Sequence, residues 1–291
     1  MKKLVFVGLG AMGYPMAGHL ADKAAASVWL WNRTTAKAEQ CATEFSVQYS
    51  DNLADVAADA DVVFTCLGRD EDVRQVMLGD AGVIALLKPG AIVVDHTTTS
   101  ASLAQELEAV CSTRKVGFLD GPLSGGEEGA KNGKLTCMLG GDATVLEQVF
   151  PYLETYCASI THIGSSGAGQ LTKMVNQICI AGILQGLSEG IEFAEAENLD
   201  LEKVLTAISG GAAQSWQMNN RGRTMHQREF DFGFALKWMV KDLGYCVTQA
   251  EQSNTRLDLA SKVLASYEQL VEQGHAQKDT SALILSQQRN V

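Results

Sequence analysis

Hydrophobic positions follow a strand-like pattern in the first half of the chain. Up to about residue 163, short apolar runs alternate with segments whose apolar residues recur at helical spacing. Several runs are apolar at consecutive positions, which is typical of parallel strands covered on both faces. The runs predict strands at 3–7, 27–31, 61–67, 91–95, 116–119, 135–139 and 159–163. Helical patterns between them, such as 12–22, 103–112 and 143–156, indicate a doubly wound parallel sheet of α/β class over residues 1–163.

From Gly164 onward the pattern is helical throughout. Residues 169–197 form one long helical pattern, which is too long for a crossover helix in a small sheet. Further helical patterns follow at 201–208, 215–226, 234–252 and 257–273, with no strand pattern among them. We therefore expect an all-α second domain at 164–291, joined to the first by a long interdomain helix and used for substrate binding and oligomerisation.

Charge and composition exclude several classes of partner. The chain has 291 residues, 46% of them hydrophobic and 20% charged, with a formal net charge of −11. A nucleic-acid binder needs a basic stripe, and no run of Lys and Arg occurs. The acidity also disfavours anionic membrane surfaces, and no apolar stretch approaches the length of a membrane span. Glycines interrupt the apolar N-terminus, so we expect no signal peptide and a cytoplasmic location.

Cysteine and histidine spacing predicts no metal site. Seven cysteines form no CxxC pair, which favours reduced, buried thiols. The five histidines are dispersed, and His96 and His162 are predicted to be structural. Glu127 and Glu128 are expected to begin a solvated helix, because carboxylates suit the N-terminal dipole.

A glycine-rich motif follows the first predicted strand and opens a helix. Gly8-Leu9-Gly10-Ala11-Met12-Gly13 matches GxGxxG in the context that dinucleotide binding requires. Gly8 permits the tight turn, Gly10 lets the backbone approach a pyrophosphate, and Gly13 allows close helix–strand packing. The uncapped N–H groups of the helix would meet the phosphates. These features predict a Rossmann domain that binds a nicotinamide dinucleotide.

The end of the second predicted strand bears on which dinucleotide binds. An NAD site usually carries Asp or Glu here, to bind the ribose 2′-hydroxyl. This chain has Asn32-Arg33-Thr34 instead. Arg33 can fork onto a 2′-phosphate, and Asn32 and Thr34 can donate hydrogen bonds beside it. We expect NADP(H) to be preferred, with NAD(H) as the alternative.

Four blocks together resemble the β-hydroxyacid dehydrogenase family, which includes 3-hydroxyisobutyrate dehydrogenases, tartronate semialdehyde reductases and glyoxylate/succinic semialdehyde reductases. The blocks are GLGAMGYPMAGHL at 8–20, DGPLSGG at 120–126, GAGQLTKMVNQ at 167–177 and KDL at 241–243. They extend over almost the whole chain, and their shared order and spacing make the resemblance specific.

The resemblance implies a role for each matching residue. Lys173 matches the family's catalytic lysine, and Asn176 lies one helical turn later on the same face. Both are expected to act in catalysis and to contact the substrate. Ser124-Gly125-Gly126 matches the loop that holds the substrate carboxylate, and its small residues and consecutive N–H groups suit that task. The other matches place Leu67, Thr98 and Lys241 at the cofactor and Asp242 on the substrate side.

Three residues depart from the family pattern. Gln177 replaces a second asparagine, Gly68 replaces a proline in the cofactor loop, and Trp238 adds a large ring near the pocket region. Because of the last two departures, the family is a weaker guide to the substrate of this chain than to its reaction type.

The resemblance and the chemistry together predict a metal-independent reductase. Reduction of an aldehyde leaves an alkoxide that needs a proton, which the Lys173 ammonium can donate. We expect an NADP(H)-dependent reductase of a small carboxylate-bearing aldehyde, such as succinic semialdehyde, glyoxylate or tartronate semialdehyde, acting as a homodimer or homotetramer. The alternatives are an NAD-dependent 3-hydroxyisobutyrate dehydrogenase and a non-catalytic NADP-binding scaffold. Imine reductases generally replace the lysine, so Lys173 argues against that group.

Overall fold

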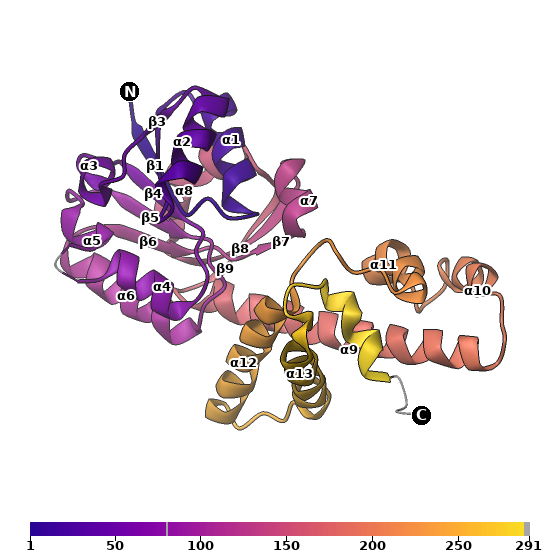
Figure 1. The fold of residues 1–291 in the computed structure, drawn as a ribbon. Coiled ribbons are helices and arrows are strands. Elements are labelled where there is room, and N and C mark those ends of the chain that lie inside the picture. Colours follow the sequence, from indigo (N-terminus) through magenta and orange to yellow (C-terminus); the bar gives the residue numbers. More distant parts are fainter. Residues whose placement is uncertain (80, 288–291) are drawn as a thin grey trace. The chain divides into compact units, whose positions relative to one another are not determined.

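The chain folds into two compact units. A computed structural model describes residues 1–79 and 81–287, and the units are Met1–Lys173 and Met174–Val291 (Figure 1). The boundary between them lies inside the long helix α9 (Ala168–Ala196), not at Gly164 where the helical pattern begins. The first turns of α9 therefore belong to the sheet-containing unit.

A single mixed sheet forms the centre of the first unit. Within the described residues, its strands are β1 (Lys3–Val7), β2 (Ser27–Trp31), β3 (Gln48–Tyr49), β4 (Val62–Thr65), β5 (Ile92–Asp95), β6 (Gly117–Asp120), β7 (Leu123–Ser124), β8 (Leu135–Gly141) and β9 (Cys157–Gly164). They are ordered β3-β2-β1-β4-β5-β6-β8-β7, and β9 pairs with β8. The strands from β3 to β6 are parallel, which confirms the predicted α/β class.

The far part of the sheet differs from the purely parallel expectation. β8 is antiparallel to both β6 and β7, while β9 is parallel to β8. The apolar run at 135–139 did correspond to a strand, but an apolar run carries no information about strand direction. β3 and β7 have two residues each, which is too short to leave a periodic signal.

Helices cover both faces of the sheet, as consecutive apolar strand residues predict (Figure 1). Leu4 and Phe6 of β1 point into one core, and Val5 and Val7 point into the other. The helices of this unit are α1 (Gly13–Lys23), α2 (Thr35–Phe45), α3 (Leu53–Ala57), α4 (Asp70–Met77), α5 (Val83–Leu86), α6 (Ala101–Thr113), α7 (Gly126–Lys131) and α8 (Ala143–Leu153). Because the strands from β3 to β6 are parallel, their carboxyl ends and the loops that follow them lie along one edge of the sheet.

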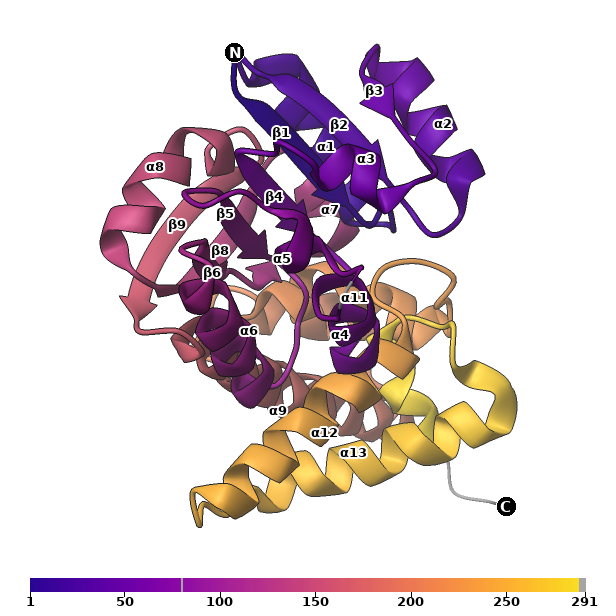
Figure 2. The same cartoon turned by 90° about the vertical axis from the view of Figure 1, so that its left-hand side faces the viewer.

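The second unit is built around the remainder of α9. Its further helices are α10 (Leu201–Ile208), α11 (Trp216–Gln227), α12 (Leu236–Gln252) and α13 (Asp258–Leu270), followed by a π-helical turn at Val271–His275 and a 3₁₀ segment at Thr280–Gln287. Figure 2 shows α12 and α13 side by side. The α-helix predicted at 257–273 ends at Leu270, and the chain continues as the π-helical turn, in which Gly274 takes a positive φ. The 3₁₀ segment was not predicted, although Ala282, Leu283 and Ile284 are buried.

Two further findings concern membranes and thiols. No helix in the described part of the chain is long and apolar enough to cross a bilayer. Five of the cysteines are buried and Cys66 is half-buried, as predicted, but Cys179 on α9 is exposed.

Candidate functional site

The glycine-rich loop lies between β1 and α1, where the motif predicts it. Gly8 has a φ of +97° and its N–H donates to the Trp31 carbonyl at 3.0 Å. A Cβ on Gly13 would collide with the Gly8 carbonyl oxygen, so that glycine is required by packing. At Gly10, by contrast, nothing described lies within 4 Å of the Cβ position. Packing does not explain Gly10, whereas close approach of a diphosphate does.

The amino end of α1 remains available to an anion. No side chain of the described residues caps this helix at Met12. Its first N–H groups carry the positive end of the helix dipole. The loop and the helix end together fit a dinucleotide pyrophosphate.

Asn32 braces the glycine-rich loop from the end of β2. Its side-chain Oδ1 accepts the Leu9 N–H at 2.9 Å, and its Nδ2 donates to the Thr34 carbonyl at 3.0 Å. Both polar ends of the amide are therefore used within the protein, and the Leu9 N–H is engaged too. Asn32 orders the glycine-rich loop, a contribution that the motif did not indicate.

Arg33 extends from the same strand end into solvent. Its side chain is 79% exposed and forms an ion pair with Asp72 of α4, with Nη1 and Oδ1 3.3 Å apart. An exposed ion pair of this kind contributes little stability and is easily exchanged for another anion. Thr34, at the start of α2, is also exposed.

Buried polar contacts join the carboxyl ends of β4 and β5. The Thr65 hydroxyl donates to Asp95 at 2.6 Å, and the Thr97 N–H donates to the same oxygen at 3.0 Å. Burial raises the pKa of Asp95 above its usual value. The Leu67 N–H donates to the Thr97 hydroxyl at 2.9 Å, which fixes the predicted cofactor loop against the segment that carries Thr98.

The predicted substrate loop follows β6. Ser124 is the last residue of the short strand β7 and is half-buried, while Gly125 and Gly126 are exposed. Gly125 has a φ of +127° and Gly126 one of +61°, values that favour glycine. At Gly126 nothing described lies within 4 Å of the Cβ position. The bend thus exposes small residues and leaves room for a ligand, as a carboxylate-binding loop requires.

Asp120, at the end of β6, binds the amino end of α9. One carboxylate oxygen accepts the Gly167 N–H at 2.7 Å and the other accepts the Gln170 N–H at 2.9 Å. Burial raises the pKa of Asp120 to about 6, against the lowering effect of these N–H groups. Asp120 lies four residues before the predicted substrate loop, so the strand end that leads into that loop is joined to the helix that carries Lys173.

Gln170 joins the same helical turn to the end of β5. Its Nε2 donates to the Thr97 carbonyl at 2.7 Å, and its Oε1 accepts the Thr99 N–H at 3.0 Å. Lys173 follows one turn later, and its exposure is 7%. Buried lysines are rare in proteins, and this one lies in the turn next to the Gln170 contacts.

The second unit contains a connected polar group on α9 and α12. Asn176 donates to the Gln177 Oε1 at 2.8 Å, and Gln177 donates to Asp242 Oδ2 at 2.7 Å. Lys241 forms an ion pair with Asp242, with Nζ and Oδ1 3.2 Å apart. The Lys241 ammonium also lies over the rings of Trp238 and Tyr245. The Asp242 carboxylate is 2% exposed and directed at these two neighbours.

Three further polar residues take part in these contacts but were not predicted as functional candidates: Asp120, Gln170 and Gln177. All three lie inside the motif blocks, and all three are buried polar residues. Gln177, which departs from the family pattern, connects Asn176 to Asp242. For Gln170 and Gln177 the available signal was a polar residue at a helix position that faces the core, and for Asp120 it was a carboxylate at the end of an apolar strand, because buried polar groups need a partner.

His96 has a structural environment, as predicted, and one of its two partners, Gly121, lies in the segment between β6 and the predicted substrate loop. The Nδ1–H donates to the Gly121 carbonyl at 2.6 Å, and Nε2 accepts from the Tyr156 hydroxyl at 2.8 Å. Burial lowers the pKa of His96 to about 4, so the ring is neutral at pH 7. A neutral ring has one donor and one acceptor nitrogen, which matches these two partners.

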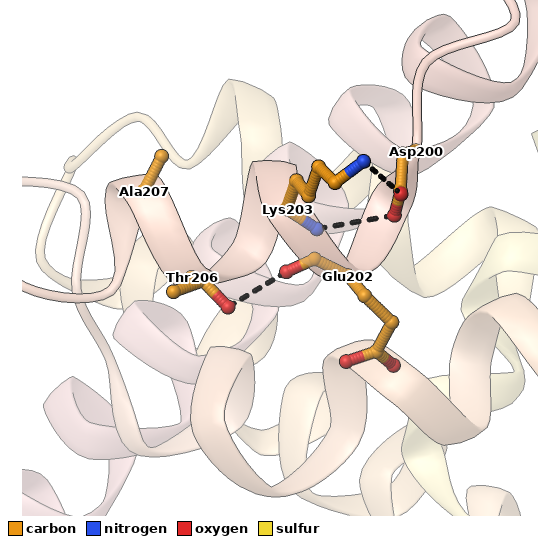
Figure 3. Close-up of a pocket in the computed structure, with 5 residues that line it drawn as sticks. All are labelled: Asp200, Glu202, Lys203, Thr206 and Ala207. Atoms are coloured by element: carbon orange, nitrogen blue, oxygen red, sulfur yellow. Dashed lines mark hydrogen bonds and ion pairs between the residues drawn. The ribbon is translucent and has the colours of Figure 1, made fainter.

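A hollow of about 400 Å³ lies elsewhere, on α10. Figure 3 shows its lining residues Asp200, Glu202, Lys203, Thr206 and Ala207, most of which bond within their own helix. None of them belongs to the candidate site. In the described residues no group of three His, Cys, Asp or Glu side chains is arranged to hold a metal ion.

Comparison with known proteins gives matches over both units. Residues 3–164 match the family model described as the NAD binding domain of 6-phosphogluconate dehydrogenase. Residues 167–286 match the model described as the NAD-binding region of NADP-dependent 3-hydroxyisobutyrate dehydrogenase. The first match contains the motif blocks at 8–20 and 120–126, and the second contains those at 167–177 and 241–243.

Similar proteins come from several bacteria. An uncharacterised oxidoreductase of Shewanella frigidimarina is 48% identical over 98% of this chain and 97% of its own length. The NAD-dependent L-serine dehydrogenase of Pseudomonas aeruginosa is 31% identical over 97% of each chain. The solved structure of Mycobacterium tuberculosis 3-hydroxyisobutyrate dehydrogenase with L-serine has a TM-score of 0.90 and 29% identity, covering 99% of this chain and 100% of that one. The chain therefore belongs to the β-hydroxyacid dehydrogenase family and is a nicotinamide-dependent oxidoreductase.

Proposed function

We propose that the protein is an NADP(H)-dependent reductase that converts a small carboxylate-bearing aldehyde into the corresponding hydroxyacid. Succinic semialdehyde, glyoxylate and tartronate semialdehyde are the proposed substrates. The observation that carries the proposal is Lys173, a lysine of 7% exposure in the turn that follows the Gln170 contacts to Thr97 and Thr99. During reduction, negative charge develops on the carbonyl oxygen of the substrate, and a cation in this position can stabilise that charge.

The proposed mechanism assigns a task to each group of residues. A bound nicotinamide supplies the hydride. Ser124, Gly125 and Gly126 hold the substrate carboxylate through the serine hydroxyl and backbone N–H groups. The Lys173 ammonium stabilises the developing alkoxide and donates its proton to that oxygen. In the reverse direction the neutral Lys173 amine accepts the hydroxyl proton of the hydroxyacid.

Asn176, Lys241 and Asp242 complete the proposed set of functional residues. Asn176 is proposed to contact the substrate with the part of its amide that Gln177 leaves available. Lys241 is proposed to contact the cofactor. Asp242 is proposed to act on the substrate side through Gln177 and Lys241, because both of its carboxylate oxygens are directed at these residues.

The proposed preference for NADP(H) depends on Arg33. No carboxylate follows β2 where a ribose 2′-hydroxyl would need one. The guanidinium of Arg33 is exposed and held by a single surface carboxylate, so it is free to reorient onto a 2′-phosphate. Thr34 supplies a hydroxyl beside it. Leu67 is proposed to contact the cofactor, and Thr98 is proposed to contact it near its nicotinamide end.

An NAD-dependent 3-hydroxyisobutyrate dehydrogenase is the second candidate. Two observations favour it. Arg33 forms an ion pair with Asp72, and a carboxylate at this position repels a 2′-phosphate. The relative from Pseudomonas aeruginosa is named as an NAD-dependent enzyme.

One assay separates these candidates. Consumption of NADPH and of NADH is measured against the three aldehydes, and reduction of NAD⁺ and NADP⁺ is measured with 3-hydroxyisobutyrate and L-serine. The proposal expects the highest kcat/KM with NADPH and one of the aldehydes. A higher kcat/KM for 3-hydroxyisobutyrate with NAD⁺ favours the second candidate. NADPH binding without turnover of any compound contradicts both and favours a non-catalytic scaffold.

We also propose a homodimer or homotetramer. Several apolar side chains of α9 are exposed in the described chain, among them Val175, Ile183 and Phe193. Exposed apolar groups along one long helix are typical of surfaces that associate. Light scattering coupled to size exclusion gives the mass, and a monomer at micromolar concentration contradicts this part of the proposal.

A further inference from the structure

The Gln170 side chain binds the backbone on both sides of Thr98. Its amide donates to the carbonyl of Thr97 and accepts from the N–H of Thr99. The side chain is 0% exposed, so water does not compete for these bonds. A planar amide that makes both bonds fixes the position and the orientation of the segment that presents Thr98.

The Asp120 carboxylate fixes the same helical turn from a second direction. It accepts the N–H groups of Gly167 and Gln170, one on each oxygen. The approach is close, because a Cβ on Gly169 would lie 2.8 Å from Asp120 Oδ2 and a Cβ on Gly140 would collide with Oδ1. Two bonds to the N-terminal turn prevent α9 from rotating or sliding at this end.

Lys173 is located by these contacts, because it follows Gln170 by three residues on the same helix. Residues three apart lie on one helical face, about one turn along. A small rotation of the first turn therefore moves the Lys173 ammonium relative to Thr98 and to the loop after Asp120. A misplacement of about 1 Å can reduce a catalysed rate by about 100-fold. A proton donor is more sensitive to such a shift than a binding contact.

We propose that Gln170, supported by Asp120, is a positioning residue for the reaction. Its amide sets the location of the Lys173 ammonium relative to the backbone that presents Thr98. The inference rests on the proposed function, in which Lys173 donates the proton. It goes beyond that function by assigning a kinetic role to a residue that transfers no proton itself. The opposing interpretation is that Gln170 stabilises the fold and has no specific effect on Lys173.

The test is a double-mutant cycle between Gln170→Met and Lys173→Ala. Methionine has nearly the length of glutamine but cannot make either amide bond. We expect Gln170→Met to lower kcat by about 10- to 100-fold when Lys173 is present. In the Lys173→Ala background the same change should alter the residual kcat by less than about twofold, because the group being positioned is gone. The Kd for NADPH and the KM for the aldehyde should each change by less than about threefold.

A control and a second variant keep the test decisive. Gln185→Met makes the same substitution further along α9, where the Gln185 Nε2 donates to the Glu189 carboxylate at 2.6 Å, and it should leave kcat unchanged. Gln170→Asn keeps the amide donor and acceptor without adding a charge but is shorter by one methylene, so it cannot reach Thr97 and Thr99 equally well, and its kcat should lie between those of wild type and Gln170→Met. If Gln170→Met does not fold, as judged by a thermal melt, Gln170→Asn replaces it in the cycle.

The possible outcomes distinguish this inference from the proposed function. Near-normal turnover of Lys173→Ala alone would contradict the proposed function. An inactive Lys173→Ala together with a normal Gln170→Met would contradict the inference and leave the function intact. Equal losses of kcat in both backgrounds would show that Gln170 has a general structural role, which also overturns the inference.

Discussion

The two ends of the proposed cofactor site in the first unit are built in opposite ways. At the ends of β5 and β6, the buried side chains of Gln170 and Asp120 tie α9 to the two strands through several short hydrogen bonds. At the end of β2, Arg33 is exposed and has a single ion pair with Asp72. One end is fixed by buried polar contacts, and the other is free to change its partner.

The difference matches what each end has to do. Proton and hydride transfer depend steeply on distance, so the groups involved need a rigid surrounding. Recognition of a 2′-phosphate depends mainly on charge and tolerates a mobile side chain. Substitutions at the buried end should therefore change kcat, whereas substitutions at the exposed end should change the choice of cofactor.

The largest effect is expected for Lys173→Ala. Loss of the proton donor should reduce kcat at least about 100-fold, or about 3 kcal/mol in the activation free energy. The Kd for NADPH, measured by fluorescence titration, should persist because the pyrophosphate contacts remain. Lys203→Ala, on an exposed lysine of α10, serves as the control and should keep normal turnover. A kcat for Lys173→Ala close to wild type would rule out the assigned role.

Arg33→Asp should change cofactor choice without abolishing catalysis. The aspartate repels a 2′-phosphate and can accept a hydrogen bond from a ribose 2′-hydroxyl. We expect the NADP/NAD ratio of kcat/KM to fall by about 30-fold, or about 2 kcal/mol. Arg256→Asp is the matched control, since Arg256 is equally exposed and paired with Asp258. An unchanged ratio would remove Arg33 from the cofactor site.

The buried end should also show a characteristic pH dependence of stability through His96. Burial lowers the pKa of His96 to about 4, so between pH 6.5 and 4 the unfolded chain binds a proton that the folded chain does not. The free energy of unfolding therefore falls on acidification, by about 2 kcal/mol from this group at pH 5. Asp120 has the opposite effect on the free energy of unfolding. Because burial raises its pKa to about 6, the folded chain binds this proton before the unfolded chain does, and acidification through pH 6 stabilises the folded state.

A single variant isolates the histidine contribution. His96→Gln can still donate to Gly121 and accept from Tyr156, but it does not titrate. The free energy of unfolding is measured with urea at pH 7.5 and at pH 5. Its decrease between the two pH values should be larger for wild type than for His96→Gln by about 2 kcal/mol. Asp120 is present in both proteins, so its effect cancels. Parallel pH dependences would mean that His96 is protonated in the folded protein at pH 5.

The smallest effect is expected for Asp72→Asn at the exposed end. Removing the carboxylate releases Arg33 and takes away a negative charge near the proposed 2′-phosphate position. Because exposed ion pairs contribute about 0–1 kcal/mol, the Kd for NADPH should decrease by at most about threefold, and less at high salt. The Kd for NADH should not change. A weaker NADPH affinity would indicate that Asp72 orients Arg33 for the phosphate.

The sequence was sufficient to predict the strands whose residues are buried on both faces. Leu4 to Val7 alternate between two cores, so every position is apolar and the run is unmistakable. The direction of β8 was not predictable, because its apolar run fits either pairing. The two-residue strands β3 and β7 are defined by their neighbours rather than by their own pattern.

Local motifs predicted the loops of the site but not the contacts between them. The glycine spacing predicted the turn before α1, because the requirement for glycine there is local: Gly8 takes a positive φ, and a side chain on Gly13 would collide with the Gly8 carbonyl oxygen. Gln170 and Asp120 meet Thr97, Thr99 and Gly167 across long stretches of sequence. Such pairs become visible only once the sheet has brought strand ends together. The role of Asn32 in bracing Leu9 was missed for the same reason.

The location of the unit boundary inside α9 decides how the protein can be dissected. A fragment ended at the apparent change of sequence pattern, near residue 164, would lack both N–H donors of Asp120 and the whole Gln170 side chain. It would leave a buried carboxylate and two backbone groups of the β5 loop without partners, and such losses cost about 1–3 kcal/mol each. A fragment extended through Lys173 keeps them all. The first turns of α9 are thus needed for the first unit to fold by itself. Expression of that unit alone should use the fragment that ends at Lys173.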